Sequence, residues 1–299
     1  MDMEKTFFQL FTGKGGVGKT SLAAASAIHY ASIGERTLVV SIDPAHSLSD
    51  SFEKNLDSEP TEISKNLFAM ELDAKKALER ESALTKRIHY FMRQAGLHDI
   101  DILETMPGID EVMAYDMLVE FIESGKYDRI IFDTAPSGHA LRFLSIPKYM
   151  DEWLKKLYSV MRQVLGTIQI VKKHSRIDIP SYKLEHEERD KVSKIYQILT
   201  NQKHTSLYIV MIPEKMCIAE TERLVAKLSS YGFQAKNIVV NQILPKREDE
   251  FLKSRRAIQQ KNLKIIREKF KGFEIKELPL FKTEIYGIKE LKKIASMLY

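Results

Sequence analysis

The chain has 299 residues, of which 44% are hydrophobic, and it carries a formal net charge of +5. This hydrophobic fraction supports a substantial core, and so mild a charge does not indicate nucleic-acid binding. The single cysteine, Cys217, excludes a disulfide framework and any zinc or iron–sulfur site built within one chain from cysteines, so we expect it to be a small buried hydrophobe. No signal-peptide pattern and no apolar run of roughly 20 residues is evident, so we expect a cytoplasmic protein.

The first predicted elements surround a glycine-rich loop. A strand is predicted over residues 6–11 and an Ala-rich helix over 21–32, and between them residues 13–20 read Gly-Lys-Gly-Gly-Val-Gly-Lys-Thr. This octapeptide fits the phosphate-loop pattern G-x-x-x-x-G-K-[ST], in which backbone N–H groups converge on phosphate oxygens. Lys19 would contact the β- and γ-phosphates, and the Thr20 hydroxyl can bind Mg²⁺. The predicted nucleotide-binding residues of this segment are Gly13, Lys14, Gly15, Gly16, Val17, Gly18, Lys19, Thr20 and Ser21.

Short apolar runs alternate with helical patterns along the rest of the chain, which is typical of an α/β protein with a mostly parallel, doubly wound sheet. Further strands are predicted over residues 37–42, 67–72, 129–133, 206–212, 238–241 and 273–278. Two helical stretches, about residues 74–124 and 146–201, are longer than a compact sheet requires between neighbouring strands. We therefore predict a single phosphate-loop (P-loop) NTPase domain over residues 1–299, in which these insertions form a helical subdomain.

Two acidic residues follow predicted strands, at the edge where open parallel sheets bind their ligands. Asp43 comes after the second strand and can orient the water that attacks the γ-phosphate, whereas Asp133 ends a Walker-B-like strand suited to Mg²⁺. Either residue alone could be a helix N-cap, but their order behind a phosphate loop favours the catalytic interpretation. We interpret the nearby His46 and His139 as loop-positioning hydrogen-bond partners. The predicted metal-site residues are Thr20, Asp43 and Asp133.

The lysine directly after the first glycine of the loop, Lys14, gives it the form K-G-G-x-G-K-[ST], which resembles the deviant Walker A ATPases. Four further segments resemble specifically the ArsA/Get-type ATPases of that group, which include arsenite-pump ATPases and targeting factors for tail-anchored proteins. These segments are D-P-A-H-S-L-S-D at residues 43–50, P-G-I-D-E at 107–111, D-T-A-P-S-G-H-A-L-R-F-L at 133–144 and E-T-E-R-L at 220–224. The resemblance extends from residue 12 to the last predicted helix, and it implies ATP with Mg²⁺ as the bound nucleotide.

The resemblance also implies roles that composition and spacing do not show. Lys14 would reach across a dimer interface to the partner's nucleotide, and Glu214 would lie near that nucleotide, so a homodimer is expected. Asn241 would contact the adenine. Pro279 and Leu280 would belong to the loop that covers it. The catalytic residues that the family pattern implies are Asp43, Lys14 and Lys19.

The chain departs from parts of the family pattern. It has one phosphate loop and only Cys217, which argues against metalloid binding through cysteines. Targeting factors of the family often clamp zinc across the dimer with a C-x-x-C pair, but Asp249 and Leu252 occupy the corresponding positions here. We therefore expect no zinc.

The predicted helical insertions carry apolar stripes with i, i+3, i+4 spacing. The longer stripe comprises Trp153, Leu154, Leu157, Tyr158, Met161, Val164, Leu165, Ile168 and Val171, and the shorter one comprises Leu84, Ile88, Phe91 and Met92. Two interpretations stay open. The stripes could pack against each other and the sheet, or two subunits could align them into a groove for a client's transmembrane helix.

Two basic stretches of the sequence each allow two functional interpretations. The Lys- and Arg-rich residues 246–271 could contact nucleic acid or an acidic membrane, but interspersed acidic residues favour a solvated helix face. The amphipathic helix predicted over residues 285–298 would suit membrane targeting. Because no linker separates it from the predicted adenine loop, we expect it to pack on the sheet.

The function that the resemblance implies is a Mg-ATP-dependent homodimeric ATPase. It would be a cytosolic targeting chaperone that shields the transmembrane segments of tail-anchored membrane proteins. It would reach the membrane only transiently, through a receptor, and would not bind nucleic acid. The alternatives are a regulatory subunit like the arsenite- or anion-pump-driving ATPases, and a MinD/ParA-type partition ATPase, which would require ATP-dependent binding to liposomes or DNA.

Overall fold

The computed structural model describes residues 6–43, 47–73, 109–134, 186–246 and 250–299, together with residues 76, 85–86 and 159. The chain divides into two compact units. One comprises Met1–Asp73, Phe121–Leu141 and Ile198–Tyr299, and the other comprises Ala74–Glu120 and Arg142–Gln197. The two apolar stripes predicted in the insertions lie outside the described residues, so the helical subdomain and its possible groove stay predictions.

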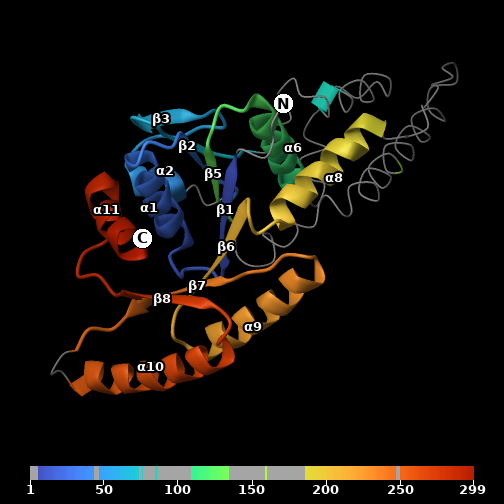
Figure 1. Cartoon of the computed structure of the whole chain (residues 1–299). Helices are drawn as coiled ribbons and strands as arrows, with labels where there is room; N and C mark the ends of the chain where they lie inside the picture. Colours follow the sequence, from blue (N-terminus) through green and yellow to red (C-terminus); the bar gives the residue numbers. More distant parts are fainter. Residues whose placement is uncertain are drawn as a thin grey trace, which may run out of the picture. The chain divides into compact units, whose positions relative to one another are not determined.

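The first unit is built on an eight-stranded sheet with the order β3-β4-β2-β5-β1-β6-β7-β8 (Figure 1). Its strands are β1 (Phe7–Gly13), β2 (Thr37–Ser41), β3 (Thr61–Ser64), β4 (Leu67–Glu71), β5 (Arg129–Asp133), β6 (Thr205–Met211), β7 (Asn237–Ile243) and β8 (Glu274–Pro279). All neighbouring strands are parallel except β3, which is antiparallel to β4. The predicted α/β fold with a mostly parallel sheet is confirmed.

The seven predicted strands match observed strands to within two residues at each end. Their near-continuous apolar sequences arise because the central strands are covered on both faces, as in β2, where every residue is buried. Strand β3 was not predicted. Its sequence, Thr-Glu-Ile-Ser, is short and half-exposed, and it lies at the edge of the sheet, so it carries no apolar run to detect.

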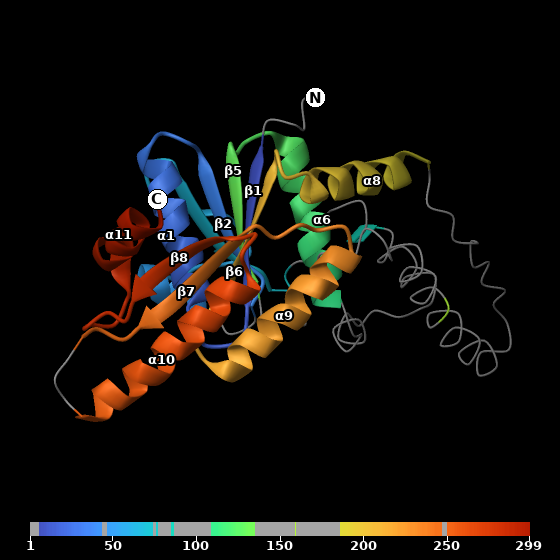
Figure 2. The same cartoon turned by 60° about the horizontal axis from the view of Figure 1, so that its bottom comes forward.

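Helices cover both faces of the sheet (Figures 1 and 2). The helices α1 (Lys19–Ser32), α2 (Ser47–Phe52) and α11 (Gly287–Leu298) lie on one face, and α9 (Lys215–Ser230) and α10 (Glu250–Lys269) lie on the other. Two helices that connect the units, α6 (Ile109–Ser124) and α8 (His186–Thr200), are also described.

The last helix packs as expected rather than standing free for a membrane. It buries Leu291, Ile294, Ala295 and Leu298, and it contacts α1 and β8. The basic stretch at residues 246–271 forms α10, which buries Leu263 and Ile266 and leaves most of its charged residues exposed, in agreement with a solvated face.

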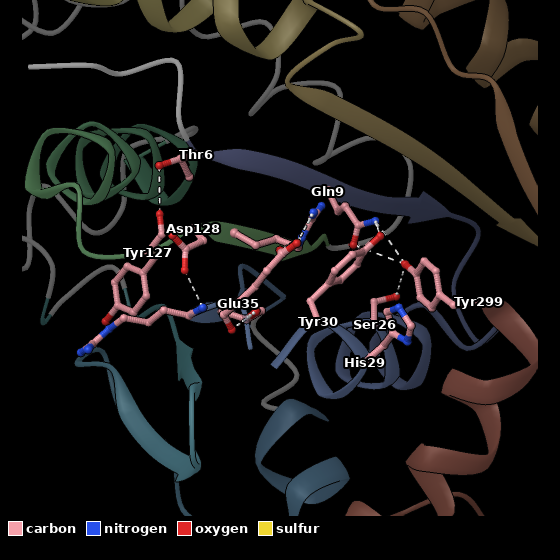
Figure 3. Close-up of polar contacts among 12 residues, drawn as sticks. Thr6, Gln9, Ser26, His29, Tyr30, Glu35, Tyr127, Asp128 and Tyr299 are labelled. Atoms are coloured by element: carbon pink, nitrogen blue, oxygen red, sulfur yellow. Dashed lines mark hydrogen bonds and ion pairs between the residues drawn. The ribbon is translucent and has the colours of Figure 1, made fainter. Parts of the chain in front are cut away.

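A polar cluster joins the residue after α11 to α1 and β1 (Figure 3). The Tyr299 hydroxyl donates to Ser26 Oγ at 3.0 Å and accepts a hydrogen bond from Gln9 Nε2 at 3.1 Å. Its ring stacks on His29 with the ring centroids 4.2 Å apart. These contacts give the buried amide of Gln9 its partners and fix α11 beside α1.

Candidate nucleotide site

The phosphate loop follows β1 and leads directly into α1, whose N-terminus therefore points at the loop. The backbone of the loop requires glycine at two positions, Gly13 and Gly18. Gly13 has a φ of 148°, and a Cβ there would lie 2.1 Å from the Val210 carbonyl oxygen of the adjacent strand β6. Gly18 has a φ of 98°, and a Cβ there would lie 2.5 Å from Asn241 Nδ2. The loop thus approaches the carboxyl ends of β6 and β7 too closely for larger residues.

The structure brings the predicted charged residues of the site together around Lys19. This side chain is only 6% exposed, and its Nζ donates to the Lys14 carbonyl oxygen at 3.2 Å. Burial lowers the pKa of the Lys19 ammonium, while the nearby carboxylates of Asp133, Asp43 and Glu220 oppose that change. Lys19, Asp43 and Asp133 therefore act on one another electrostatically.

Asp133 lies at the centre of this group and is fully buried at the end of β5. Burial raises the pKa of its carboxyl group to about 7, although hydrogen bonding to Thr20, the charge of Lys19 and hydrogen bonding to Ser41 oppose the rise. Ser41 Oγ donates to Asp133 Oδ2 at 3.3 Å. The other carboxylate oxygen, Oδ1, is buried without a hydrogen-bond partner within the described part of the chain. An acceptor in that position is suited to water bound to a cation.

The residues present fit Mg²⁺ that is also bound to a nucleotide. Thr20 Oγ1 lies 3.0 Å from Ser47 Oγ, and the Thr20 side chain also hydrogen-bonds to the Asp133 carboxyl group. Hydroxyl, carboxylate and water oxygens are the ligands that Mg²⁺ prefers. Across the segments that the structure describes, no cluster of three His, Cys, Asp or Glu side chains could hold a metal by itself. Nucleotide phosphates and water would therefore complete the coordination.

Asp43 and the start of α2 are held by residues at the ends of β2 and β4. The Asp43 backbone N–H donates to Ser41 Oγ at 3.3 Å. The buried carboxylate of Glu71 accepts hydrogen bonds from Leu48 N, Ser49 N and Ser49 Oγ, each at 2.8 Å. Sequence analysis missed the role of Glu71, although an acidic residue that ends an apolar strand is the same pattern that identified Asp133. His46 lies outside the described residues.

The end of β7 lies against the phosphate loop. Asn241 Nδ2 donates to the Val17 carbonyl oxygen at 2.9 Å, and Asn241 Oδ1 accepts from Gln242 N at 2.9 Å. The backbone N–H of Leu280, directly after β8, donates to the Ile243 carbonyl oxygen at 2.8 Å. Pro279, the last residue of β8, pairs with Ile243, and Leu280 is exposed, so both predicted adenine-loop residues lie beside Ile243, two residues after Asn241 in β7. Their contacts with adenine stay predictions.

The two residues predicted to act across a dimer, Lys14 and Glu214, both lie near the start of α9. Glu214 is the N-cap residue of α9, with its side chain about half exposed and its Oε1 3.8 Å from an Arg255 guanidinium nitrogen. Cys217, in the first turn of α9, is buried as predicted, and burial raises the pKa of its thiol while the charge of Lys14 opposes this. Lys14 thus lies close enough to α9 to influence it. His139 belongs to a segment outside the described residues.

Comparison with known proteins identifies the family. A family model described as anion-transporting ATPase (ArsA) matches residues 6–299. The chain is 36% identical to a protein named putative arsenical pump-driving ATPase from Chlorobaculum tepidum, over 97% of this chain and 74% of that protein. It is 33% identical to ATPase ASNA1 homolog 1 of Paramecium tetraurelia, over 96% of this chain and 90% of that protein. It is 34% identical to ATPase GET3 of Podospora anserina, over 96% and 88% respectively. These matches confirm the resemblance inferred from the motifs, and the chain belongs to the ArsA family of anion-transporting ATPases.

Proposed function

We propose that this protein is a Mg-ATP-dependent ATPase that works as a homodimer in the cytosol and shields the transmembrane segments of tail-anchored membrane proteins. The observation that carries the ATPase proposal is the grouping of Lys19, Asp43 and Asp133 behind a glycine-dependent phosphate loop. The targeting proposal rests on the resemblance of this chain to the targeting factors of the family and on the apolar stripes in its sequence.

In this proposal the loop amides and the N-terminus of α1 bind the phosphates, with the Lys19 ammonium at the β- and γ-phosphates. Thr20 and Asp133 would hold Mg²⁺, Asp133 through bound water. Such an ion supplies charge neutralisation on the β- and γ-phosphate oxygens. Asp43 orients the attacking water from the end of β2. Lys14 of one subunit stabilises charge at the nucleotide of the other.

Shielding has a clear physical purpose. A transmembrane segment of roughly 20 apolar residues has several tens of kcal/mol of transfer free energy that drives its aggregation in water. A nucleotide-dependent groove would convert contacts at the γ-phosphate into exposure or closure of an apolar surface.

None of the helices within the described ranges is long and apolar enough to cross a membrane.

Capture of a client tests the targeting proposal. The chain would be co-expressed with a tail-anchored protein and purified, and a soluble complex is expected. Leu157→Asp with Met161→Asp, which places charge in the apolar stripe, should abolish the complex without loss of ATP hydrolysis. The matched control is Lys155→Asp with Ser159→Asp, which alters polar positions outside the stripe and should leave the complex intact. Failure to form a complex with several clients, or unfolding caused by the stripe variants alone, would show that the stripe is core.

The second candidate function is a pump-driving or regulatory ATPase that responds to an oxyanion, because several relatives are named putative arsenical pump-driving ATPases. The buried and isolated thiol of Cys217 argues against metalloid capture by cysteines within one chain. The two functions differ in what stimulates ATP hydrolysis. Stimulation by arsenite or another oxyanion, without stimulation by a tail-anchored client, would favour the pump-driving function.

A further inference from the structure

The strand β7 becomes irregular where it reaches the phosphate loop. Its pairing with β8 shifts register between Val240 and Ile243, and Gln242 within this interval has a φ of 59°. Such a bulge leaves backbone groups without partners in the sheet and needs outside contacts to hold it. A non-glycine residue at positive φ in a strand also costs conformational energy. This stretch must therefore be stabilised by the surrounding structure.

Gln259 of α10 provides that stabilisation. Its Oε1 accepts a hydrogen bond from Leu244 N at 2.9 Å, and its Nε2 donates to the Gln242 carbonyl oxygen at 3.1 Å. A primary amide carries both a donor and an acceptor at its end, so one side chain satisfies both backbone groups. Gln260, the next residue of α10, is exposed.

The bulge in turn aims two side chains at the phosphate loop. Gln242 Nε2 donates to the Gly16 carbonyl oxygen at 3.4 Å, and Asn241 Nδ2 donates to the Val17 carbonyl oxygen at 2.9 Å. In a planar trans peptide, the carbonyl group of one residue and the N–H of the next point in opposite directions. Holding these two carbonyl groups toward β7 therefore turns the N–H groups of Val17 and Gly18 the other way. Oriented N–H groups of this kind are what a phosphate loop uses to bind phosphate.

We propose that Gln259 and Gln242 are positioning residues for nucleotide binding. Gln259 holds the bulge, the bulge directs Gln242, and Gln242 sets the orientation of amides in the phosphate loop. The helix α10, on the opposite face of the sheet from α1, is thereby connected to the nucleotide site. This inference rests on the proposed ATP binding at the loop and is independent of client shielding.

Three single variants test it. Gln242→Gly removes the side chain but accepts the positive φ, so it isolates the contact with Gly16. Gln259→Met keeps the length of the side chain but loses the hydrogen bonds to Leu244 N and to the Gln242 carbonyl oxygen. Gln260→Met is the matched control on the exposed neighbour. Dissociation constants for ATP and ADP with Mg²⁺ would be measured by titration calorimetry, with thermal unfolding of each variant followed in parallel.

We expect Gln242→Gly and Gln259→Met each to weaken ATP binding about five- to tenfold, the size expected for the loss of a hydrogen bond. The control should bind ATP as the wild type does. Because Gln259 acts through Gln242, the double variant should bind no more weakly than the weaker of the two single variants. Gln259→Met should also lower thermal stability, because it leaves Leu244 N and the Gln242 carbonyl oxygen without this partner. A purely structural role of Gln259 would lower stability in the same way, but its effect on ATP binding would be absent or would add to that of Gln242→Gly.

Folded variants that bind ATP with wild-type affinity would overturn the inference, and so would strictly additive losses. If Gln259→Met does not fold, Gln242→Gly alone decides whether the contact with Gly16 positions the loop. A wild-type protein that binds no nucleotide would contradict the proposed ATPase function itself, which is a distinguishable result.

Discussion

At the scale of single residues, the proposed Mg²⁺ site includes Asp133, a buried carboxylate whose Oδ1 has no hydrogen-bond partner in the described segments. Asp133→Asn keeps the size of the side chain but removes the charge that would attract Mg²⁺ through its water shell. We expect ATP affinity in the presence of Mg²⁺ to fall by about tenfold or more, whereas affinity measured in EDTA should change little. Equal losses in both conditions would show that Asp133 serves the loop and not the metal.

A second residue-scale prediction concerns His29, which stacks on Tyr299 and has Arg129, Glu35 and Lys276 in its surroundings. Burial lowers the pKa of His29, Arg129 and Lys276 add to this, and Glu35 opposes it. The unfolded chain therefore binds a proton at His29 more readily than the folded chain does. The stability that this difference provides is complete above the unfolded pKa of about 6.5 and is lost as the pH falls through the folded value.

His29→Phe tests this because phenylalanine keeps an aromatic ring for stacking but does not titrate. Between about pH 7 and pH 5 the wild type should lose more free energy of unfolding than the variant, as measured by urea denaturation. Parallel curves for the two proteins would mean that the folded pKa of His29 is not lowered.

At the scale of elements, the buried carboxylate of Glu71 caps the start of α2, which begins four residues after Asp43. Glu71→Gln removes the charge and replaces one acceptor oxygen by an amide donor, so Ser49 Oγ can no longer donate to that atom and the hydrogen bonds from Leu48 N and Ser49 N become weaker. We expect a loss of about 1–3 kcal/mol in the free energy of unfolding. Turnover should fall more than ADP affinity does, because α2 begins four residues after Asp43, the proposed water-orienting residue. Glu62→Gln on the exposed edge strand β3 is the matched control.

The elements also show how far the sequence could predict the molecule. The phosphate loop and the strands were predictable because each is one contiguous segment with its own spacing or apolar run. Contacts between segments distant in the sequence, such as that of Gln259 with Gln242, leave no local pattern. The position of Asn241 was expected from the family, but its hydrogen bond to Val17 was not. The absence of a linker before the last helix predicted that it packs on the sheet; α11 does contact β8, but it packs mainly on α1, which was not predicted.

At the scale of the whole molecule, the proposed homodimer depends on Lys14. If this lysine reaches the partner's nucleotide, sedimentation should show a dimer that is promoted by a slowly hydrolysed ATP analogue. Lys14→Ala should weaken this nucleotide dependence, while Lys65→Ala, on an exposed turn, should behave as the wild type does. The same monomeric profile for all three proteins, with and without the analogue, would remove the role across subunits.

We propose that the residues around the phosphate loop hydrolyse ATP, with Asp43 orienting the attacking water. The most direct test is to measure Mg-ATP turnover and ATP affinity for the wild type and for Asp43→Asn. General-base or water-orienting residues contribute roughly 10²–10⁴-fold to rate, so turnover should fall by about 100-fold or more while ATP binding is retained. Hydrolysis by Asp43→Asn at the wild-type rate would contradict this account of the site.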